Sequence, residues 1–417
     1  MEVSDNEDSP WDINEEYEAG FIRQIDASQR GEVVSIPHPL DRVGEVFNIM
    51  PSRYTFIFGA TGSGKTSYMD YTYILAPWSY LQKHELDIHW EINYFSLERK
   101  KMFKHAKWVS WMMYRDNTEL LVSADQIMGW QGGPMNTVGY NLVRQYDQEM
   151  SNLLDHVNIY DGKVNVKVIE RKIFERAYEL GTFFRADERG VRMDDQLIYI
   201  KEFSTDGIEE ITKKGEKKIY IQLEWEGTTF KIYPDKHRYF AKHPRTFVFF
   251  LIDGINLLGS KDVIDDISVV LSNARDLFGF APVVVSQQNR AMGDITRTKI
   301  HGADLSPQIE DAFKSSQMGF DADLIIGLFD PVRYKAWDKE GNYGGYHINP
   351  DSNSIGSMQS PSGINRFRSM HILKNTFGAD GLVIGMKFLG ECNHFSTLPF
   401  PDTIELENVY SDIRRGL

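Results

Sequence analysis

The chain has 417 residues, of which 41% are hydrophobic and 13% aromatic, so it can bury a sizeable core in one decorated domain or in two or three domains. A formal net charge of −14 argues against a surface that is basic throughout, and a nucleic-acid partner would need a local basic lining. A single cysteine, Cys392, excludes an internal disulfide framework and favours a reducing compartment.

The N-terminal segment is acidic. Residues 1–20 carry eight acidic residues and no Lys or Arg, whereas a secretory signal would be basic and apolar. We expect residues 1–35 to form a mobile tail, which is either inert or a docking arm for a basic partner. No apolar run reaches membrane-spanning length, so we expect a cytoplasmic protein, in the host cytoplasm if a virus encodes it.

From residue 36 to residue 417 strand-like and helix-like segments alternate. Near-continuous apolar runs recur as YTFIF, EINYFSL, TFVFFLID, APVVVSQ, ADLIIGLF and GLVIGMKFLG. Such strands are typical of a parallel sheet that is covered by helices on both faces. The predicted fold class is therefore α/β, with a mostly parallel central sheet.

A glycine-rich turn follows the first of these strands. The sequence GATGSGKT matches G-x-x-x-x-G-K-[ST], with a strand before it and a helix-compatible segment after it. The backbone N–H groups of such a turn surround the phosphates of ATP, Lys65 neutralises them, and the Thr66 hydroxyl binds Mg²⁺. The helix that begins near Lys65 directs its positive end to the same anion. The predicted nucleotide-binding residues are Gly59, Ala60, Thr61, Gly62, Ser63, Gly64, Lys65, Thr66 and Ser67.

Three later strands end on polar residues. Glu98 ends EINYFSLE, and a carboxylate there can orient and deprotonate the attacking water. Asp253 ends TFVFFLID, where a P-loop ATPase holds its metal through water. Gln287 ends APVVVSQ, and its amide is placed to sense the γ-phosphate. The alternatives are an exposed Glu98, a helix N-cap at Asp253 and a packed or solvated Gln287.

Two stretches depart from this pattern. Between about residues 158 and 243 polar and apolar residues alternate, with turn signals at STDG, KKGEKK and WEGT. We expect an antiparallel β insertion with one solvated face. Residues 338–366 are rich in Gly, Ser, Asn and Pro, and predict a flexible loop.

Taken in chain order, these segments resemble the RecA-like P-loop ATPase core of DnaB-like replicative helicases. The segments FSLER, LIDGINLL and VSQQNR are similar to FSLEM, VIDYLQLM and LSQLNR of that family. HPLDRVGEVF resembles its entry segment, DADLIIGLF a late strand, and LKNTFGADGLVIGMKFLGECNHF its terminal hairpin. The resemblance covers about residues 36–395 with the middle insertion excluded, and its strength lies in the order of the motifs.

The resemblance implies an enzyme that uses ATP and Mg²⁺ and acts as a 5′→3′ DNA helicase, with Glu98 as the catalytic glutamate. Such a protein forms a homo-oligomeric, hexameric ring that binds ATP between subunits and single-stranded DNA in its channel. Primase and loader proteins are its implied partners. The DNA-facing loop would be residues 290–320, whose basic residues contact phosphates unless the loop is merely solvated. Those basic residues are Arg290, Arg297, Lys299 and Lys314.

The chain departs from the family in three places. Only about forty residues precede the core, too few for the family's amino-terminal helical domain, which suggests a minimal version as viral or mobile replication systems encode. The middle insertion is longer than the family needs. The hairpin pattern K-x-R reads Lys374-Asn375-Thr376, so Lys374 is the predicted cation for the neighbouring subunit's site. Arg366 or Arg368 could substitute for the missing arginine.

Two other functions stay open. A RecA- or RadA-type strand-exchange ATPase shares the core and forms filaments. An ATP-binding scaffold or assembly protein with little unwinding activity would fit the missing arginine and the acidic net charge.

Overall fold

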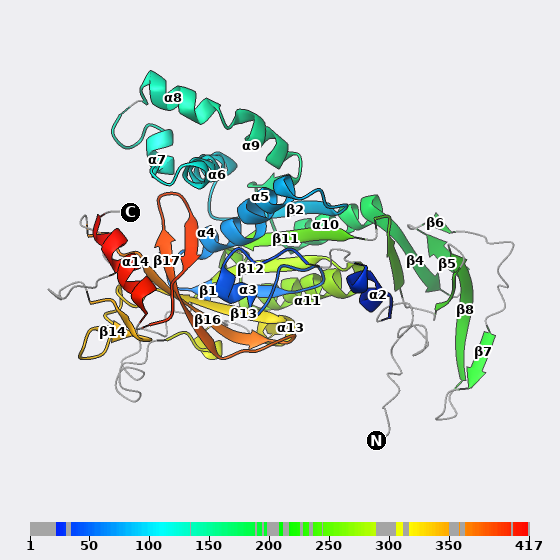
Figure 1. Ribbon diagram of the computed structural model, residues 1–417. Helices are drawn as coiled ribbons and strands as arrows, with labels where there is room; N and C mark the ends of the chain where they lie inside the picture. Colours follow the sequence, from blue (N-terminus) through cyan, green and yellow to red (C-terminus); the bar gives the residue numbers. More distant parts are fainter. Residues whose placement is uncertain are drawn as a thin grey trace.

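The structure is a computed structural model, which describes the following residues (Figure 1): 22–30, 35–133, 135–187, 190–193, 196–197, 208–211, 217–225, 228–232, 237–243, 245–288, 306–311, 317–349, 358, 363–401 and 403–415.

A central nine-stranded sheet organises the described residues, in the order β18-β17-β16-β13-β1-β12-β11-β2-β3. Its parallel strands are β1 (Thr55–Gly59), β2 (His89–Ser96), β3 (Val157–Tyr160), β11 (Thr246–Asp253), β12 (Ala281–Gln287) and β13 (Leu324–Phe329). Antiparallel pairs at one edge add β16 (Phe367–Asn375), β17 (Leu382–Leu389) and β18 (His394–Thr397). The prediction of an α/β fold with a mostly parallel sheet is confirmed.

Helices cover both faces of this sheet, because successive strand residues point to opposite faces. In β1, Phe56 and Phe58 join one apolar cluster and Ile57 joins the other. One face carries α3 (Asp41–Gly44), α4 (Lys65–Asp70), the π-helix η2 (Tyr71–Leu75), α5 (Ala76–Lys83), α6 (Lys101–Asp116) and α9 (Asp147–Leu154). The other carries α10 (Val166–Leu180), the 3₁₀ turn η3 (Ile255–Leu257), α11 (Lys261–Phe278) and α13 (Gln317–Asp321). Among the described residues no helix is long and apolar enough to cross a membrane.

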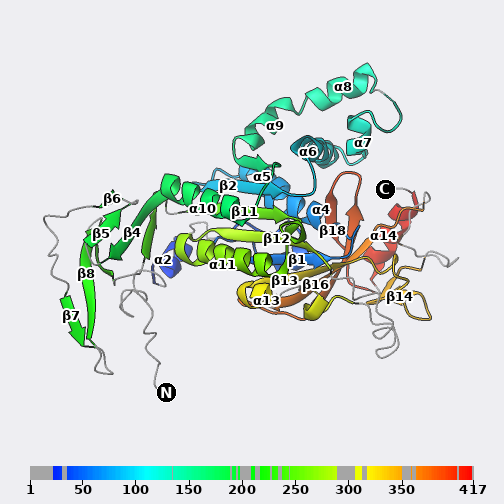
Figure 2. The ribbon, with the colours of Figure 1, turned by 180° about the vertical axis from the view of Figure 1, so that it is seen from behind.

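A helical arm rises from the first face beside α6 (Figures 1 and 2). It consists of α7 (Ala124–Ile127), α8 (Thr137–Arg144) and α9. Ser123 caps α7 by accepting a hydrogen bond from the Gln126 backbone, while the Gln126 side chain accepts one from the Ser123 N–H. Helix α8 has no buried residue, whereas α9 buries Met150 and Leu153 against the core. The arm is therefore anchored mainly at its two ends.

The antiparallel insertion begins later than expected. Strand β3, predicted to open it at about residue 158, pairs parallel with β2 instead and forms the edge of the central sheet. Helix α10 follows, and its apolar residues Ile169, Ile173 and Ala177 are buried at helical spacing. The described antiparallel strands then run from residue 181 to residue 241 and extend away from the central sheet (Figure 1). The short edge strand β3 is only partly buried, which explains why its polarity resembles that of the insertion.

Two small sheets make up the described part of this insertion. One has the order β10-β4-β5-β6 and the other β7-β8-β9. Their strands are β4 (Gly181–Asp187), β5 (Gly190–Met193), β6 (Gln196–Leu197), β7 (Ile208–Ile211), β8 (Lys217–Trp225), β9 (Thr228–Ile232) and β10 (His237–Ala241). Since β4 and β10 pair directly, the insertion leaves and re-enters the core at neighbouring points.

The two segments expected to be flexible contain ordered elements. Helix α2 (Arg23–Gln29) lies within the predicted tail, whose residues 1–21 and 31–34 are outside the described part. The segment 338–366 contains the hairpin of β14 (Asn342–Tyr343) and β15 (Tyr346–His347). Its Tyr346 and Ile348 are buried against helix α14 (Ile404–Arg415), so the described part of this segment packs on the core. A further 3₁₀ turn, η5, covers Ile309–Asp311.

Candidate nucleotide-binding site

The predicted phosphate loop connects β1 to α4 at the carboxyl edge of the parallel strands. Two of its glycines are required by close approaches. A Cβ at Gly59 would lie 2.2 Å from the backbone oxygen of Leu328 on β13, so a side chain there would clash with the neighbouring strand. Gly64 has a φ of 93°, and a Cβ there would meet the rings of Phe395 and Phe388 at 3.0 and 3.2 Å. The loop is thus held tightly against the sheet.

Two side chains of the loop suit an anionic ligand. Lys65 is 8% exposed, and its Nζ donates to the Ala60 carbonyl at 2.9 Å. Burial lowers the pKa of Lys65 to about 8, although Glu98 and Asp253 act in the opposite direction. The Ser63 hydroxyl is buried, and no described residue forms a hydrogen bond with it. A bound phosphate would supply the charge and the hydrogen-bond partner that these two groups need.

The predicted metal side of the site forms at the end of β11. Thr66 Oγ1 donates to Asp253 Oδ1 at 2.7 Å, so the hydroxyl and the carboxylate that were predicted from separate motifs are in contact. A hydroxyl and a carboxylate are hard oxygen donors of the kind Mg²⁺ prefers, and this donor set fits the ion. Burial alone would raise the pKa of Asp253, but the ion pair with Lys104 and the hydrogen bonds from Lys104, Thr66 and Tyr94 lower it.

Glu98 and Gln287 meet across the same edge. Gln287 Nε2 donates to Glu98 Oε1 at 3.4 Å, and both side chains are exposed. Gly254 follows Asp253 with a φ of 94°, and a Cβ there would lie 2.8 Å from Glu98 Cγ. Asn256 supports this corner by donating to the Gln287 carbonyl at 3.1 Å. The parallel sheet therefore places the proposed base, the sensor and the metal carboxylate at three adjacent strand ends.

Sequence patterns missed two arginines on the phosphate loop. Arg333, in the turn after β13, donates to the Thr61 carbonyl. Arg368, on β16, donates to the Gly62 carbonyl at 3.3 Å and forms an ion pair with Asp330 at 3.3 Å. No local motif marks either residue, because their positions depend on the antiparallel pairing of β13 with β16.

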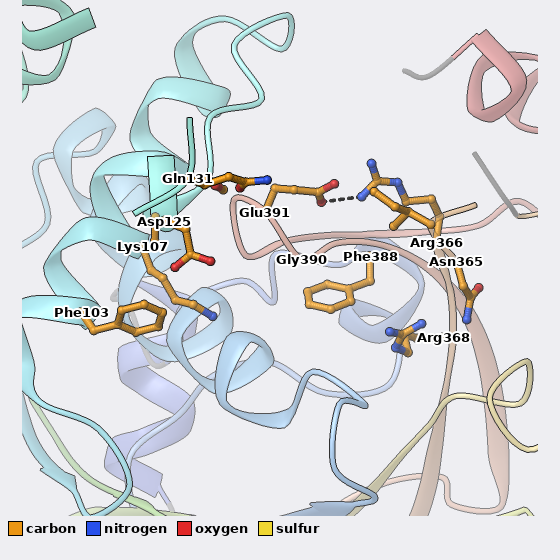
Figure 3. A pocket seen from close by; sticks show the side chains of 13 residues that line it. Phe103, Lys107, Asp125, Gln131, Asn365, Arg366, Arg368, Phe388, Gly390 and Glu391 are labelled. Atoms are coloured by element: carbon orange, nitrogen blue, oxygen red, sulfur yellow. Dashed lines mark hydrogen bonds and ion pairs between the residues drawn. The ribbon is translucent and has the colours of Figure 1, made fainter. Parts of the chain in front are cut away.

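A cavity of about 360 Å³ opens beside the loop, between α6–α7 and the β16–β17 strands (Figure 3). Phe103 and Lys107 line it from α6, and Arg366, Arg368 and Phe388 line it from the sheet. Burial lowers the pKa of Lys107 to about 8. Because Phe388 also lies against Gly64, the cavity adjoins the phosphate loop.

Lys374 lies at the other edge of the sheet. It pairs with Ile325 on β13, whereas Arg368 lies at the opposite end of β16, on the phosphate loop. Its Nζ donates to the carbonyls of Gly319 and Phe320, each at 3.1 Å. Lys374 therefore cannot reach the phosphate loop of its own chain and could act only on a neighbouring copy.

The other predicted cations are placed differently. Arg366 and Arg368, the alternatives to Lys374, are 5% and 7% exposed and lie at the edge that carries their own chain's phosphate loop. Arg366 is paired with Glu391. Arg290, Arg297, Lys299 and Lys314 lie outside the described residues.

Comparisons with known proteins agree with this fold. No protein-family model matches the chain, and no curated protein matches it. A solved structure of a DnaB-like replicative helicase, described with its interactions with primase, superposes with a TM-score of 0.57 at 16% identity. It covers 93% of this chain and 69% of that one. A second solved structure, an isolated helicase ATPase domain, superposes with a TM-score of 0.55 at 15% identity, over 93% of this chain and 100% of that one. The chain has the RecA-like P-loop fold of these helicase ATPase domains.

Proposed function

We propose that this chain, with the fold of DnaB-like helicase ATPase domains, is an ATP-hydrolysing motor of DNA replication that translocates on single-stranded DNA. The contact between Thr66 and Asp253 at 2.7 Å, beside the buried ammonium of Lys65, carries the ATPase part of this proposal. A phosphate loop, a metal carboxylate and a candidate base at one sheet edge are what phosphoryl transfer to water requires.

The chain's own residues divide the hydrolytic work. Backbone N–H groups of the loop and Lys65 hold the phosphates, and Thr66 and Asp253 would hold Mg²⁺, which neutralises phosphate charge when bound. Glu98 takes the proton of the attacking water as general base. Its contact with Gln287 links the base to β12 and to the segment that follows it.

The cavity beside the loop would take the nucleoside. Phe388 offers an aromatic face next to Gly64, and Arg368 reaches the loop from the same wall. An apolar wall with a few polar groups is the usual form of such a pocket. The phosphates and the nucleoside would then lie on one continuous surface.

Assembly completes the proposed motor. A homo-oligomeric, hexameric ring would bring Lys374 of one copy to the phosphate loop of the next, and residues 290–320 would face DNA in the channel. Translocation would run 5′→3′ in the cytoplasm, and primase or a loader protein would be the partner. The position of Lys374 at the sheet edge opposite its own phosphate loop supports an action between copies.

A second candidate is an ATP-binding scaffold with little unwinding activity. Lys374 already donates to two carbonyls of its own chain, and residue 376 is threonine where the family has arginine. Both features would reduce catalysis between copies.

ATP hydrolysis with and without single-stranded DNA separates the two candidates. We expect DNA-stimulated turnover in the wild type, none in Lys65→Ala, and unwinding of a forked duplex. Nucleotide binding without DNA stimulation or unwinding would favour the scaffold. Filaments rather than rings on DNA in electron micrographs would favour a RecA- or RadA-type strand-exchange protein.

A further inference from the structure

A second buried lysine lies behind the proposed metal carboxylate. Lys104 projects from α6 into a cluster with Asp70 of α4, Tyr94 of β2 and Asp253 of β11. The side chain of Lys104 is 1% exposed, and those of Asp70 and Asp253 are 0% and 1% exposed. Neither the phosphate loop nor the proposed base contacts this ammonium, so the hydrolytic steps above leave it without a role.

The geometry makes Lys104 the centre of the cluster. Its Nζ lies 2.9 Å from Asp253 Oδ2 and 3.6 Å from Asp70 Oδ1, and it donates to the Tyr94 hydroxyl. An ammonium has three N–H donors, and three oxygens from three different elements surround this one. The Tyr94 hydroxyl lies 3.0 Å from Asp70 and 3.2 Å from Asp253, but its single hydrogen can be donated to only one of them. Lys104 is therefore the steady donor at Asp253 Oδ2.

The two oxygens of Asp253 are thus held from opposite sides. Lys104 binds Oδ2 from the core, while Thr66 donates to Oδ1 at 2.7 Å on the phosphate side. These two contacts set the plane of the carboxylate. We propose that Lys104 is a positioning residue, which holds Asp253 so that Oδ1 stays beside Thr66, where the metal of a bound nucleotide would be.

Stability alone does not account for a charge at this position. Helix α6 already buries Trp108 and Met112 against the same face, and an apolar side chain at 104 could join them. A buried ammonium with carboxylates is often no more stable than a well-packed apolar group. The charge is explained if it orients a carboxylate that must serve a ligand, which is how outer residues tune metal sites. This inference rests on the proposed ATPase function.

Calorimetric titration with ADP tests the inference without turnover. The affinity is measured once with excess Mg²⁺ and once with EDTA, and the ratio gives the gain due to the metal. Methionine matches the length of lysine without its charge, so Lys104→Met should reduce this gain roughly 10- to 100-fold. The affinity for ADP in EDTA should stay at the wild-type value, since Lys104 does not contact the phosphate loop.

Two further variants separate positioning from folding. Trp108→Phe removes the hydrogen bond at 3.1 Å to Asp70 and leaves the contact between Lys104 and Asp253, so it should lower Tm and keep the gain. The double variant Lys104→Met/Asp70→Asn keeps the formal charge of the cluster and should lose the gain as Lys104→Met does. If a folded Lys104 variant keeps the wild-type gain, this inference is overturned while the ATPase proposal stands. A wild type without any Mg²⁺-dependent gain overturns both.

Discussion

Lys65 and Lys104 are both buried, yet their surroundings differ in a way that suits different tasks. Lys104 is surrounded by two carboxylates and a hydroxyl, so its charge is matched by the protein itself. Lys65 donates to a single backbone carbonyl, and burial lowers its pKa to about 8. We interpret the first as an orienting residue and the second as a group that waits for an anion.

The pKa of Lys65 predicts proton uptake on nucleotide binding. Near pH 8 part of the free protein has a neutral Lys65, and bound phosphates favour the charged form. Binding should therefore take up protons near pH 8 and take up few at about pH 6.5, where Lys65 is already charged. Calorimetry of ADP binding in buffers of different ionisation enthalpy measures this uptake. Equal uptake at both pH values would show that another group titrates.

Glu98→Gln tests the proposed base. Glutamine keeps the size of the side chain but cannot accept a proton, so turnover should fall by roughly 10²–10⁴-fold while nucleotide binding is kept. Glu98 is exposed, and the exchange should leave Tm unchanged. Equal losses of binding and turnover would make Glu98 a structural residue, and another carboxylate would have to be the base.

At the scale of elements, the pairing of β13 with β16 decides which cations reach which site. The antiparallel register sets Lys374 opposite Ile325 and Ser369 opposite Phe329. The amino end of β16 therefore carries Arg368 to the phosphate loop, and its carboxyl end carries Lys374 away from it. One strand thus contributes to the chain's own site at one end and presents a lysine at the far edge with the other.

The insertion should be removable as an element. Arg185 of β4 pairs with His237 of β10, so replacing residues 186–236 with Asn-Gly joins two paired residues through a two-residue hairpin turn. We expect a folded protein with wild-type ATP hydrolysis without DNA, because Lys65, Glu98 and Asp253 lie on other elements. Circular dichroism and ATPase assays measure the two results. A folded variant without ATPase activity would mean that the insertion completes the site.

At the scale of the whole molecule, the proposed ring predicts complementation between copies. Lys374→Ala should be inactive because the neighbouring site loses its cation, an effect worth roughly 10³–10⁵ in rate for arginine fingers. Lys65→Ala should also be inactive. Mixed rings contain some interfaces with both lysines intact, so mixing the two variants should restore part of the turnover.

The control for this mixing experiment is an exposed lysine that lies away from both sites. Lys339→Ala should hydrolyse ATP at the wild-type rate. Normal turnover by Lys374→Ala alone would show that Lys374 is not the cation between copies. If Arg366→Ala and Arg368→Ala were also normal, the ring mechanism would fall and the scaffold would gain.

The phosphate loop and the strand-end residues follow from the sequence by itself. Gly59–Thr66 is contiguous, so its motif contains all the contacts that define it. Glu98, Asp253 and Gln287 end apolar strands, and parallel strands bring their carboxyl ends to one edge whatever their order. These predictions needed only local pattern and the direction of the chain.

Tertiary structure alone decided the remaining contacts. Arg333 and Arg368 reach the phosphate loop, and Lys104 reaches Asp253, through packing between elements far apart in the chain. The insertion begins at residue 181 rather than about 158, because β3 pairs with β2 and α10 packs on the core. Partners of this kind depend on register and helix packing, which no spacing within one segment encodes.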